Sequence, residues 1–392
     1  MPDYTYLIVG GGMTADAAAH AVREVDPAGS IGIIGAERHP PYDRPPLTKA
    51  LWKGEPEDKI WRKTAETGAV LHEGRRVMAI DSRAHSATDD RGATYRFKKL
   101  LLATGGTPRQ LPLKTDQIIY FRTLDDYRRL RALAAHDVRF AVMGGGFIGS
   151  EIAAALRMQG RNVTMLVPEA GVGARVFPSD LAAFLVDYYR KKGVTMRMGE
   201  GMAGLEARAG SCVVRTTTGA EVTAEVVVAG LGILPSVELA EQAGLGVDNG
   251  IVVDELCRTS HLDIYAAGDV ANFANPALGT RLRVEHEDNA NTMGRVAGLN
   301  MGGRARPYHH LPFFYSDLFE LGYEAVGDVD ARLETVAEWK EPFREGVVYY
   351  LKAGRVRGVL LWNTWGQVDH ARALIAEPGP FTAKDLKGRL PR

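Results

Sequence analysis

Residues 5–24, TYLIVGGGMTADAAAHAVRE, decide how the chain begins to fold. Residues 6–9 are apolar and favour a strand, three glycines follow, and the alanine-rich remainder has helical spacing. The pattern predicts a strand, a tight turn and a helix, with Gly10, Gly12 and Ala15 on the positions of a Gly-x-Gly-x-x-Gly/Ala motif. Small residues there allow the sharp turn, the approach of a diphosphate to the backbone, and close packing of helix on strand. The amides at the helix start would bind the negative charge of that diphosphate.

An acidic residue at the end of the next strand supports this interpretation. Residues 30–37, SIGIIGAE, form a β-favouring run that ends at Glu37. In a dinucleotide-binding fold, a carboxylate at this position accepts hydrogen bonds from the adenosine ribose. Glycine turns of this kind also occur without a nucleotide, but the turn and the acid together predict dinucleotide binding.

The same arrangement recurs in residues 139–171, RFAVMGGGFIGSEIAAALRMQGRNVTMLVPEAG. Gly144, Gly146 and Gly149 fill all three glycine positions, and Glu169 ends the following strand. A repeat within one chain is much stronger evidence than a single copy. Two dinucleotides on one protein indicate a redox pair, for which FAD with a nicotinamide dinucleotide is the usual combination.

Two residues bear on which nicotinamide dinucleotide binds. Glu169 would accept hydrogen bonds from both ribose hydroxyls of NADH and repel the additional phosphate of NADPH. Arg175 lies nearby in the sequence and could serve that phosphate. The sequence favours NADH and leaves NADPH open.

The composition excludes several other classes of function. The chain has 392 residues, 45% of them apolar, and 48 charges of each sign, so nothing draws it as a whole toward nucleic acid or anionic lipid. No apolar run approaches the roughly 18 residues that span a bilayer, and the N-terminus lacks the pattern of a signal peptide. We therefore expect a cytoplasmic protein. Cys212 and Cys257 are far apart in the sequence, which argues against a disulfide reductase, and no residues are assigned to a metal.

Other stretches carry polar residues next to predicted elements. Prolines should delay helix formation in residues 38–52, RHPPYDRPPLTKALW, until about Leu47, and the cations Arg44 and Lys49 are either solvated or face a phosphate or flavin. Asp269 follows a buried strand and either binds a polyol chain or caps a helix. Glu285 and His286 are expected at the start of a helix that begins near residue 287.

From about residue 307 the pattern changes to short antiparallel strands with a closing helix at 367–376. Most of the aromatic side chains of Phe313, Phe314, Tyr315 and Tyr323 are expected in the core of this part. The final stretch, residues 381–392, is polar and predicted to be mobile.

The order of the motifs GGGMTA, PYDRPPLTKALW, ATGGTPR, GGGFIGSE, AAGD, VEHEDNA and FFYSDL resembles the flavoproteins with two dinucleotide-binding domains. Within them the chain is similar to the ferredoxin reductases of oxygenase systems, and more similar still to apoptosis-inducing factor, over nearly its whole length. The resemblance implies an α/β protein with two Rossmann-like, glutathione-reductase-like domains and a C-terminal α+β domain with an antiparallel sheet. The FAD-binding domain would cover 1–113 and 236–306, the NAD(H)-binding domain 114–235, and the C-terminal domain 307–392.

The resemblance also implies residue roles. Lys49, Glu151, Phe147 and His286 would act in catalysis, with Lys49 paired to Glu151 beneath the flavin and Phe147 where the nicotinamide must stack. The full cofactor-binding set would be Gly10, Gly12, Ala15, Glu37, Arg44, Lys49, Val77, Ala103, Thr104, Gly105, Gly144, Gly146, Phe147, Ile148, Gly149, Glu151, Glu169, Arg175, Gly232, Gly268, Asp269, Glu285, His286 and Tyr315. The chain departs from apoptosis-inducing factor in having Tyr315 for a tryptophan, His286-Glu287 for a double histidine and Asn289 for a later histidine, so a role in cell death is not carried over.

The implied activity is transfer of a hydride from NADH to FAD and then of electrons to an acceptor, first of all a ferredoxin-type iron–sulfur protein. A quinone or oxygen as acceptor stays open, as does a slow NADH sensor that keeps a stable charge-transfer complex and dimerises. Because ferredoxins are acidic, a docking patch should be basic, and Arg304, Arg306, His309 and His310 are candidates, with ordinary surface charge as the equal alternative. The sequence leaves the oligomeric state open, with a homodimer as one possibility, and predicts no nucleic-acid partner.

Overall fold

The computed structural model describes residues 1–113, 115 and 117–390, and within them the chain forms two compact units. The first unit combines residues 1–44, 56–107 and 234–312, and the second combines 45–55, 108–233 and 313–392. Lys114, where the second domain is expected to begin, lies outside the described residues. The domain boundaries expected from the sequence therefore stay a prediction.

The first unit is built on a seven-stranded sheet of β1 (Asp3–Val9), β2 (Ile31–Ile34), β3 (Val70–His72), β4 (Val77–Asp81), β5 (Ser86–Asp89), β6 (Thr94–Leu102) and β18 (Ile264–Ala266). β3, β2, β1 and β6 lie side by side and parallel, β18 joins β6 in parallel, and β5 and β4 continue the sheet antiparallel. β1 and β2 are apolar almost throughout because both faces of the parallel part are covered. A smaller sheet contains β17 (Ile251–Val252), β19 (Ala271–Asn275) and β20 (Thr280–Leu282).

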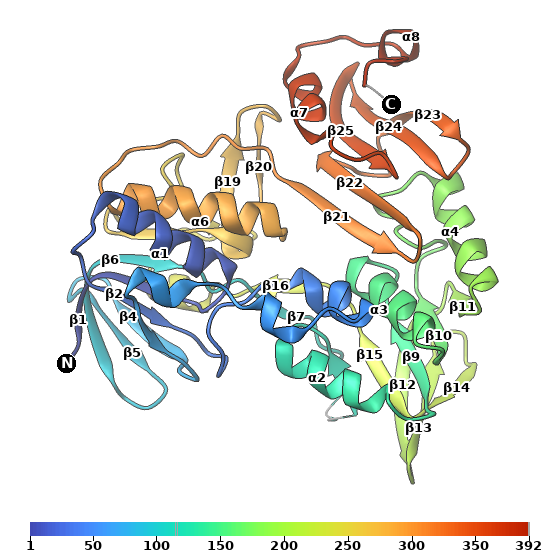
Figure 1. Cartoon of the computed structure of the whole chain (residues 1–392), viewed down its shortest axis with the longest axis horizontal. Coiled ribbons are helices and arrows are strands. Elements are labelled where there is room, and N and C mark those ends of the chain that lie inside the picture. The colour runs from blue at the N-terminus through green and yellow to red at the C-terminus, as the bar shows by residue number, and fades with distance from the viewer. Residues whose placement is uncertain (114, 116, 391–392) are drawn as a thin grey trace. The chain divides into compact units, whose positions relative to one another are not determined.

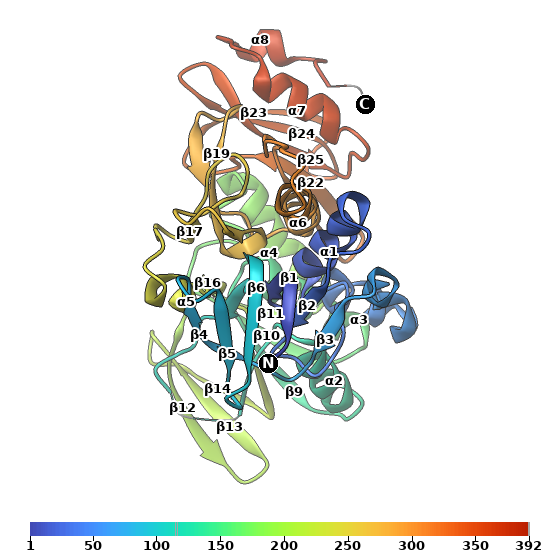
Figure 2. The same cartoon turned by 90° about the vertical axis from the view of Figure 1, so that its left-hand side faces the viewer.

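Two helices of the first unit pack closely against each other. The unit contains α1 (Met13–Val25), α5 (Glu238–Gln242) and α6 (Glu287–Met301), with 3₁₀ turns η3 (Glu57–Ile60), η4 (Thr64–Thr67) and η5 (Gly268–Val270). α1 and α6 lie side by side along the parallel sheet in both views (Figure 1 and Figure 2). A methyl group at Gly294 would lie 2.5 Å from the Thr14 carbonyl oxygen, and one at Gly298 would overlap the Ala18 carbonyl oxygen. The two glycines of α6 therefore set the distance to the helix that follows the first turn.

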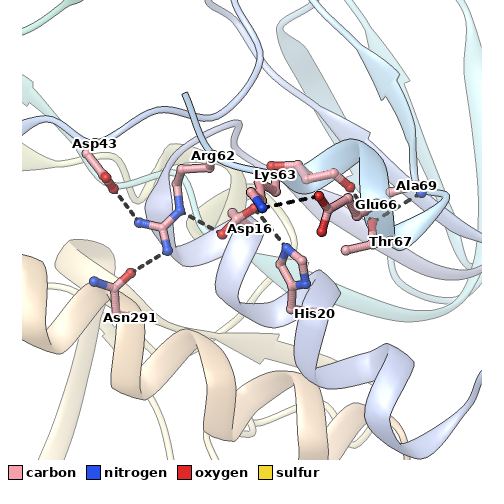
Figure 3. A network of polar contacts seen from close by, with 10 residues as sticks. Asp16, His20, Asp43, Arg62, Lys63, Glu66, Thr67, Ala69 and Asn291 are labelled. Atoms are coloured by element: carbon pink, nitrogen blue, oxygen red, sulfur yellow. Dashed lines mark hydrogen bonds and ion pairs between the residues drawn. The ribbon is translucent and has the colours of Figure 1, made fainter. Parts of the chain in front are cut away.

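A buried polar network fixes the start of α1 (Figure 3). Asp16 is 4% exposed, and its carboxylate accepts hydrogen bonds from Arg62 at 2.6 Å and from the Thr64 hydroxyl at 2.5 Å. The same guanidinium contacts Asp43 at 2.6 Å and the Asn291 side chain of α6 at 2.9 Å. One arginine thus joins α1, α6 and two loops around the end of the first glycine turn.

The second unit contains a parallel five-stranded sheet in the order β11-β10-β9-β15-β8. Its strands are β8 (Ile118–Tyr120), β9 (Arg139–Met143), β10 (Asn162–Val167), β11 (Thr195–Met198) and β15 (Val226–Ala229), accompanied by α2 (Leu124–Leu133), α3 (Phe147–Met158) and α4 (Ser179–Lys191). An antiparallel sheet of β12 (Met202–Arg208), β13 (Ser211–Thr216) and β14 (Glu221–Ala224) follows β11. Two short strands at the sequence boundaries of the units, β7 (Gly106–Pro108) and β16 (Ile233–Pro235), form a separate two-stranded sheet.

The C-terminal part of the second unit is an antiparallel sheet in the order β21-β22-β25-β24-β23. It consists of β21 (Phe313–Leu318), β22 (Leu321–Gly327), β23 (Glu334–Glu341), β24 (Glu345–Lys352) and β25 (Arg355–Trp362), with α7 (Val368–Ala376) against β22 and β25 and α8 (Ala383–Leu386) after it. This is the strand pattern that the sequence predicts for residues 313–362. Among the described residues, no helix combines the length and apolar character that crossing a membrane requires.

Three local expectations are wrong. The helical turn of the proline-rich segment starts at Pro45 rather than near Leu47, as η1 (Pro45–Thr48), because the first turn of a helix needs no N–H donors. Tyr323 is fully buried, but the aromatic residues of β21 are only half-buried because β21 is an edge strand. Residues 381–390 of the expected mobile tail are ordered: α8 has a capping box at Thr382, and Leu386 is buried.

The role of Arg62 in the polar network around Asp16 can be tested by substitution. Replacing Arg62 with methionine removes the guanidinium but keeps an unbranched apolar stem, and leaves the buried Asp16 carboxylate without its cation. We expect Arg62→Met to lower the free energy of unfolding by about 3 kcal/mol, measured by urea denaturation of the purified protein.

The matched control is Lys63→Met. The Lys63–Glu66 pair beside the network is 78% and 64% exposed with the charged atoms 3.6 Å apart, so its loss should change stability by no more than about 0.5 kcal/mol. Equal effects of the two substitutions would contradict the role given to Arg62.

Candidate functional site

In the first glycine turn, one glycine has no room for a side chain and another is surrounded by open space. Gly10 has φ +119°, and a methyl group there would overlap the Ala103 carbonyl oxygen. A methyl group at Gly12 would have no described atom within 4 Å. Ala15 is completely buried where α1 meets the sheet. A turn that presents its backbone to a diphosphate is expected to combine close packing at Gly10 and Ala15 with open space at Gly12.

Beyond β2, the acidic residue of the first motif is held by two partners. The Glu37 carboxylate accepts hydrogen bonds from the Tyr42 hydroxyl at 2.6 Å and from Arg44 at 2.5 Å. Burial alone would lower the pKa of Arg44, but Tyr42, Glu37 and Asp269 raise it, so the guanidinium stays charged. The Gly74 amide donates to the Glu37 carbonyl at 2.8 Å. This hydrogen bond places the turn that precedes β4, which begins at Val77, next to Glu37.

Other expected residues of the first unit lie at strand ends. The Thr104 hydroxyl donates to the Ser236 carbonyl at 2.8 Å, so it ties this strand end to residue 236. Gly105 and Gly268 have φ values of +63° and +78°, and a methyl group at Gly268 would overlap the Thr14 hydroxyl of α1. Asp269 lies within η5, whose N-cap position is taken by Ala267. Its charge acts on His286, the N-cap residue of α6, so binding of a polyol chain and helix capping both stay predictions for Asp269.

His286 and Glu285 stand at the start of α6, as expected. His286 is the N-cap residue, and burial lowers its pKa to about 4 against the opposing charges of Asp269 and Asp288. The imidazole is therefore neutral at pH 7. The Glu285 carboxylate lies 2.7 Å from the guanidinium of Arg283, so its charge is balanced within the first unit.

The second glycine turn repeats the geometry of the first. Gly144 has φ +96°, and a methyl group there would overlap the Gly230 carbonyl oxygen. At Gly146 an added methyl group would again be free of described atoms within 4 Å, whereas at Gly149 it would overlap the Gly144 carbonyl oxygen. Gly232, with φ +81°, accepts a hydrogen bond from the Arg109 amide on its carbonyl at 2.9 Å. Ile148 follows Phe147 in the first turn of α3.

The two expected specificity residues of this unit are paired with each other. Arg175 donates to the Glu169 carboxylate at 2.7 and 3.0 Å, and its side chain is 86% exposed. The Gly199 amide donates to the Glu169 carbonyl at 3.2 Å, as the Gly74 amide does to Glu37. Sequence reasoning missed Gly74 and Gly199, although both are glycines placed just after the third strand of each repeat.

A buried carboxylate forms the polar centre of the second unit. Glu151 lies in α3, is 3% exposed, and has its Oε1 atom 2.8 Å from the Lys49 ammonium. Lys49 lies between the 3₁₀ turns η1 and η2 (Ala50–Lys53). This segment is anchored by Trp52, whose indole N–H donates to the Leu47 carbonyl and whose ring packs edge-on against Tyr127. The predicted Lys49–Glu151 pair is therefore present.

Aromatic side chains lie next to this ion pair. The Lys49 ammonium lies 5.2 Å from the centre of the Tyr315 ring. Phe147 is 37% exposed, and its ring centre is 5.0 Å from that of Phe314 on β21. Two hydroxyl groups that the sequence analysis did not select, Thr48 and Ser316, also contact Glu151. No local signal marks them, because they are 103 and 165 residues away from it in the sequence.

The expected basic docking patch is weaker than the sequence suggests. His310 lies 2.6 Å from Asp288 and His309 lies 3.5 Å from Glu255, so both histidines face carboxylates. The two arginines of the patch are exposed. Residues 304–310 thus carry two exposed cations and two carboxylate-paired histidines.

The two cysteines do not form a redox centre in the described part of the chain. Cys212 and Cys257 are buried free thiols, and burial raises the pKa of each. A buried thiol with a raised pKa is a poor nucleophile at neutral pH.

Comparisons with known proteins agree with this geometry. A family model described as pyridine nucleotide-disulphide oxidoreductase matches residues 4–294, and one described as the C-terminal part of mitochondrion-associated apoptosis-inducing factor matches 297–342 and 337–377. The chain is 38% identical over 380 residues to the ferredoxin–NAD(+) reductase component of the anthranilate 1,2-dioxygenase system of Burkholderia cepacia, covering 95% of this chain and 94% of that protein. It is 32% identical over 417 residues to mitochondrial apoptosis-inducing factor 1 of Dictyostelium discoideum, with coverage of 95% and 78%. The putidaredoxin reductase–putidaredoxin complex aligns with a TM-score of 0.89 and 30% identity, over 97% of this chain and 94% of that one.

The chain belongs to the pyridine nucleotide-disulphide oxidoreductase family. This confirms the predicted fold class of two dinucleotide-binding domains with a C-terminal antiparallel-sheet domain, and the predicted class of enzyme, an oxidoreductase that uses FAD and NAD(H). The roles of the individual site residues stay predictions.

The two kinds of glycine in each turn should respond differently to alanine. Gly12 has φ −100° and open space around it, so Gly12→Ala should leave thermal unfolding of the flavin-free protein unchanged. The added methyl group would occupy the space kept for the diphosphate, and we expect FAD affinity, measured by flavin fluorescence, to fall about tenfold, which corresponds to about 1.4 kcal/mol.

Gly10→Ala is the matched comparison. It creates an overlap and a strained positive φ, so it should lower the unfolding temperature of the flavin-free protein itself. If Gly12→Ala destabilised the flavin-free protein as much as Gly10→Ala, the assignment of Gly12 to the diphosphate would be contradicted.

Proposed function

We propose that this chain is the reductase of an electron-transfer system, which oxidises NADH on a bound FAD and passes single electrons to a ferredoxin-type iron–sulfur protein. The observation that carries the proposal is the duplicated glycine turn: in each unit a methyl group would overlap backbone at the first glycine, Gly10 or Gly144, and would meet open space at the second, Gly12 or Gly146. When bound, NADH and FAD supply the hydride donor and the hydride acceptor.

The residues of each unit would bind one cofactor. In the first unit, the α1 amides after Gly12 would hold the FAD diphosphate, and Glu37 would bind its ribose. In the second unit, the α3 amides after Gly146 and the Glu169 carboxylate would do the same for NADH. Glu169 favours NADH because a 2′-phosphate would face its negative charge, but Arg175 can turn away from the carboxylate at little cost because the pair is exposed. We retain NADH as the preferred donor.

Lys49 would supply a fixed positive charge. Reduction adds negative charge to the flavin ring, and a preorganised ammonium group stabilises such charge without reorganisation. His286 is neutral at pH 7 and would contribute a hydrogen bond rather than a charge. Phe147 is exposed next to the open Gly146, and we propose that its ring yields its place to the nicotinamide.

The acceptor is inferred from the relatives and from the cysteines. Relatives matched over nearly the whole chain are named ferredoxin–NAD(+) reductases, and one solved relative is complexed with putidaredoxin. Both cysteines are buried, so a dithiol acceptor within the described residues has no support. The cytoplasmic location and the homodimer remain predictions.

A slow NADH sensor is the second candidate. It is favoured by the match of residues 297–377 to the C-terminal part of apoptosis-inducing factor. In that case Phe147 and Tyr315 would keep the two cofactor rings stacked for a long time, and dimerisation would follow.

One experiment separates the two functions. The FAD-loaded protein is titrated with NADH without oxygen, mixed with a [2Fe–2S] ferredoxin, a quinone or oxygen, and analysed by size-exclusion chromatography. A reductase should bleach with one equivalent of NADH and reoxidise fastest with the ferredoxin. A persistent long-wavelength absorption band with a doubled mass would favour the sensor, and a colourless protein that cannot be reconstituted with FAD would exclude both.

Removing the ammonium group tests its role. We expect Lys49→Met to slow flavin reduction at saturating NADH by about 10–100-fold in stopped-flow measurements, because the charge that stabilises the reduced ring is lost. Lys53→Met is the matched control from the same segment: the Lys53–Asp317 pair is half-exposed, and its loss should change the rate less than twofold. An unchanged rate in Lys49→Met would remove Lys49 from the mechanism.

A further inference from the structure

The Glu151 carboxylate has three polar partners, two hydroxyl donors and the Lys49 ammonium, of which only Lys49 was expected. The Ser316 hydroxyl donates to Oε1 at 2.5 Å and the Thr48 hydroxyl donates to Oε2 at 2.5 Å. The Lys49 ammonium contacts Oε1 at 2.8 Å. Thr48, Ser316 and Glu151 are 6%, 0% and 3% exposed, so water does not replace these contacts.

The three partners of Glu151 come from two segments that are distant in sequence from α3. Thr48 and Lys49 are adjacent in the proline-rich segment, and Ser316 is on the edge strand β21. The segment that carries Thr48 is held in place by Trp52 and by Gln159 of α3, whose side-chain amide donates to the Trp52 carbonyl at 2.9 Å. The donors are therefore positioned by rigid neighbours and do not adjust freely to the carboxylate.

Among the described residues around Glu151, no charged group other than Lys49 compensates the carboxylate. Two buried phenols, Tyr189 and Tyr323, lie near Glu151, and burial followed by the charge of Glu151 raises the pKa of both. Both phenols therefore stay neutral. Tyr189 donates its proton to the Ser150 carbonyl at 3.0 Å rather than to the carboxylate.

The two hydroxyl groups satisfy part of the hydrogen-bonding capacity of Glu151 that would otherwise depend on Lys49. A buried carboxylate with unfilled acceptor positions costs free energy, so each hydroxyl that donates to Glu151 lowers its dependence on the nearby cation. Thr48 occupies Oε2 and Ser316 shares Oε1 with the ammonium group, which lies 2.8 Å from that oxygen. The ammonium group keeps further N–H bonds directed elsewhere and stays close to the Tyr315 ring.

We propose that Thr48 and Ser316 are positioning residues for flavin reduction: their hydroxyls hold Glu151 so that Lys49 keeps its ammonium group directed at the flavin and not collapsed onto the carboxylate. This inference rests on the proposed function. It assigns a positioning role to two buried residues that would act only through the Lys49–Glu151 pair.

The test compares isosteric and conservative substitutions in the FAD-loaded protein. Thr48→Val and Ser316→Ala should each lower the limiting rate of flavin reduction by about 5–10-fold, with an unchanged dissociation constant for NADH. The fraction of flavin reduced at a fixed NADH/NAD⁺ ratio should fall about threefold, because the field that stabilises the reduced ring is weaker. Thr48→Ser, which restores the hydroxyl, should recover both values to within twofold.

A double-substitution experiment separates positioning from packing. In a Lys49→Met background, Thr48→Val and Ser316→Ala should cause no further loss of rate, because the group through which they act is already absent. Rates and reduced fractions equal to wild type in the single variants would overturn the proposal, and so would equal losses with and without Lys49.

FAD content and unfolding temperature are measured for every variant. If Ser316→Ala fails to fold, the Thr48→Val and Thr48→Ser pair decides alone. A wild-type protein that NADH does not reduce would refute the proposed function, whereas a wild-type protein that is reduced normally with insensitive Thr48 and Ser316 variants refutes only this inference.

Discussion

The architecture depends on the close approach of backbone to backbone at two places. At Gly10 the chain passes so near to the carbonyl of Ala103 that no side chain fits, and at Gly144 it passes equally near to the carbonyl of Gly230. Each approach brings the end of one parallel strand next to the start of a helix, where a methyl group at Gly12 or Gly146 would meet no described atom within 4 Å. We propose that both units bind a diphosphate at this place, because the amides at a helix start favour negative charge.

The chemistry depends on a second constraint, the solvation of one buried carboxylate. Residues 45–55 lie between two stretches of the first unit in the sequence, yet they pack within the second. They bring Thr48 and Lys49 to Glu151, and the edge strand β21 brings Ser316. A buried carboxylate is stable only when its oxygens are satisfied, so the same contacts that stabilise this part of the unit also orient the cation that the proposed reaction requires.

Features encoded within a short stretch could be predicted from the sequence, and features encoded by distant partners could not. The two glycine turns, the acids Glu37 and Glu169 and the C-terminal strands are local patterns, and the structure contains them. The Lys49–Glu151 pair came from the family resemblance rather than from spacing. The hydroxyl donors to Glu151 and the Arg62 network had no signal, because serine, threonine and arginine have the same appearance in a sequence whether they are buried or solvated. The carboxylate partners of the two histidines in the expected docking patch had no local signal either, since they lie elsewhere in the chain.

The two copies of the internal repeat differ most in how the acid that ends the second strand is paired with an arginine. At this pair we also expect the two cofactors to differ in how long they stay bound. Both acids pair with an arginine, seven residues later in the first unit and six in the second. Arg44 is 21% exposed, is fixed by Glu37 and also contacts Tyr42, whereas Arg175 is 86% exposed and contacts Glu169 at the surface. A partly buried, multiply bonded pair costs more free energy to break than an exposed pair, which exchanges readily with water. A preassembled first site suits a cofactor that stays bound through many reaction cycles, and a loosely paired second site suits one that must enter and leave in every cycle. The repeat supplies one fold twice, and we propose that the different solvation of Arg44 and Arg175 helps the first copy to retain its cofactor and the second to release it.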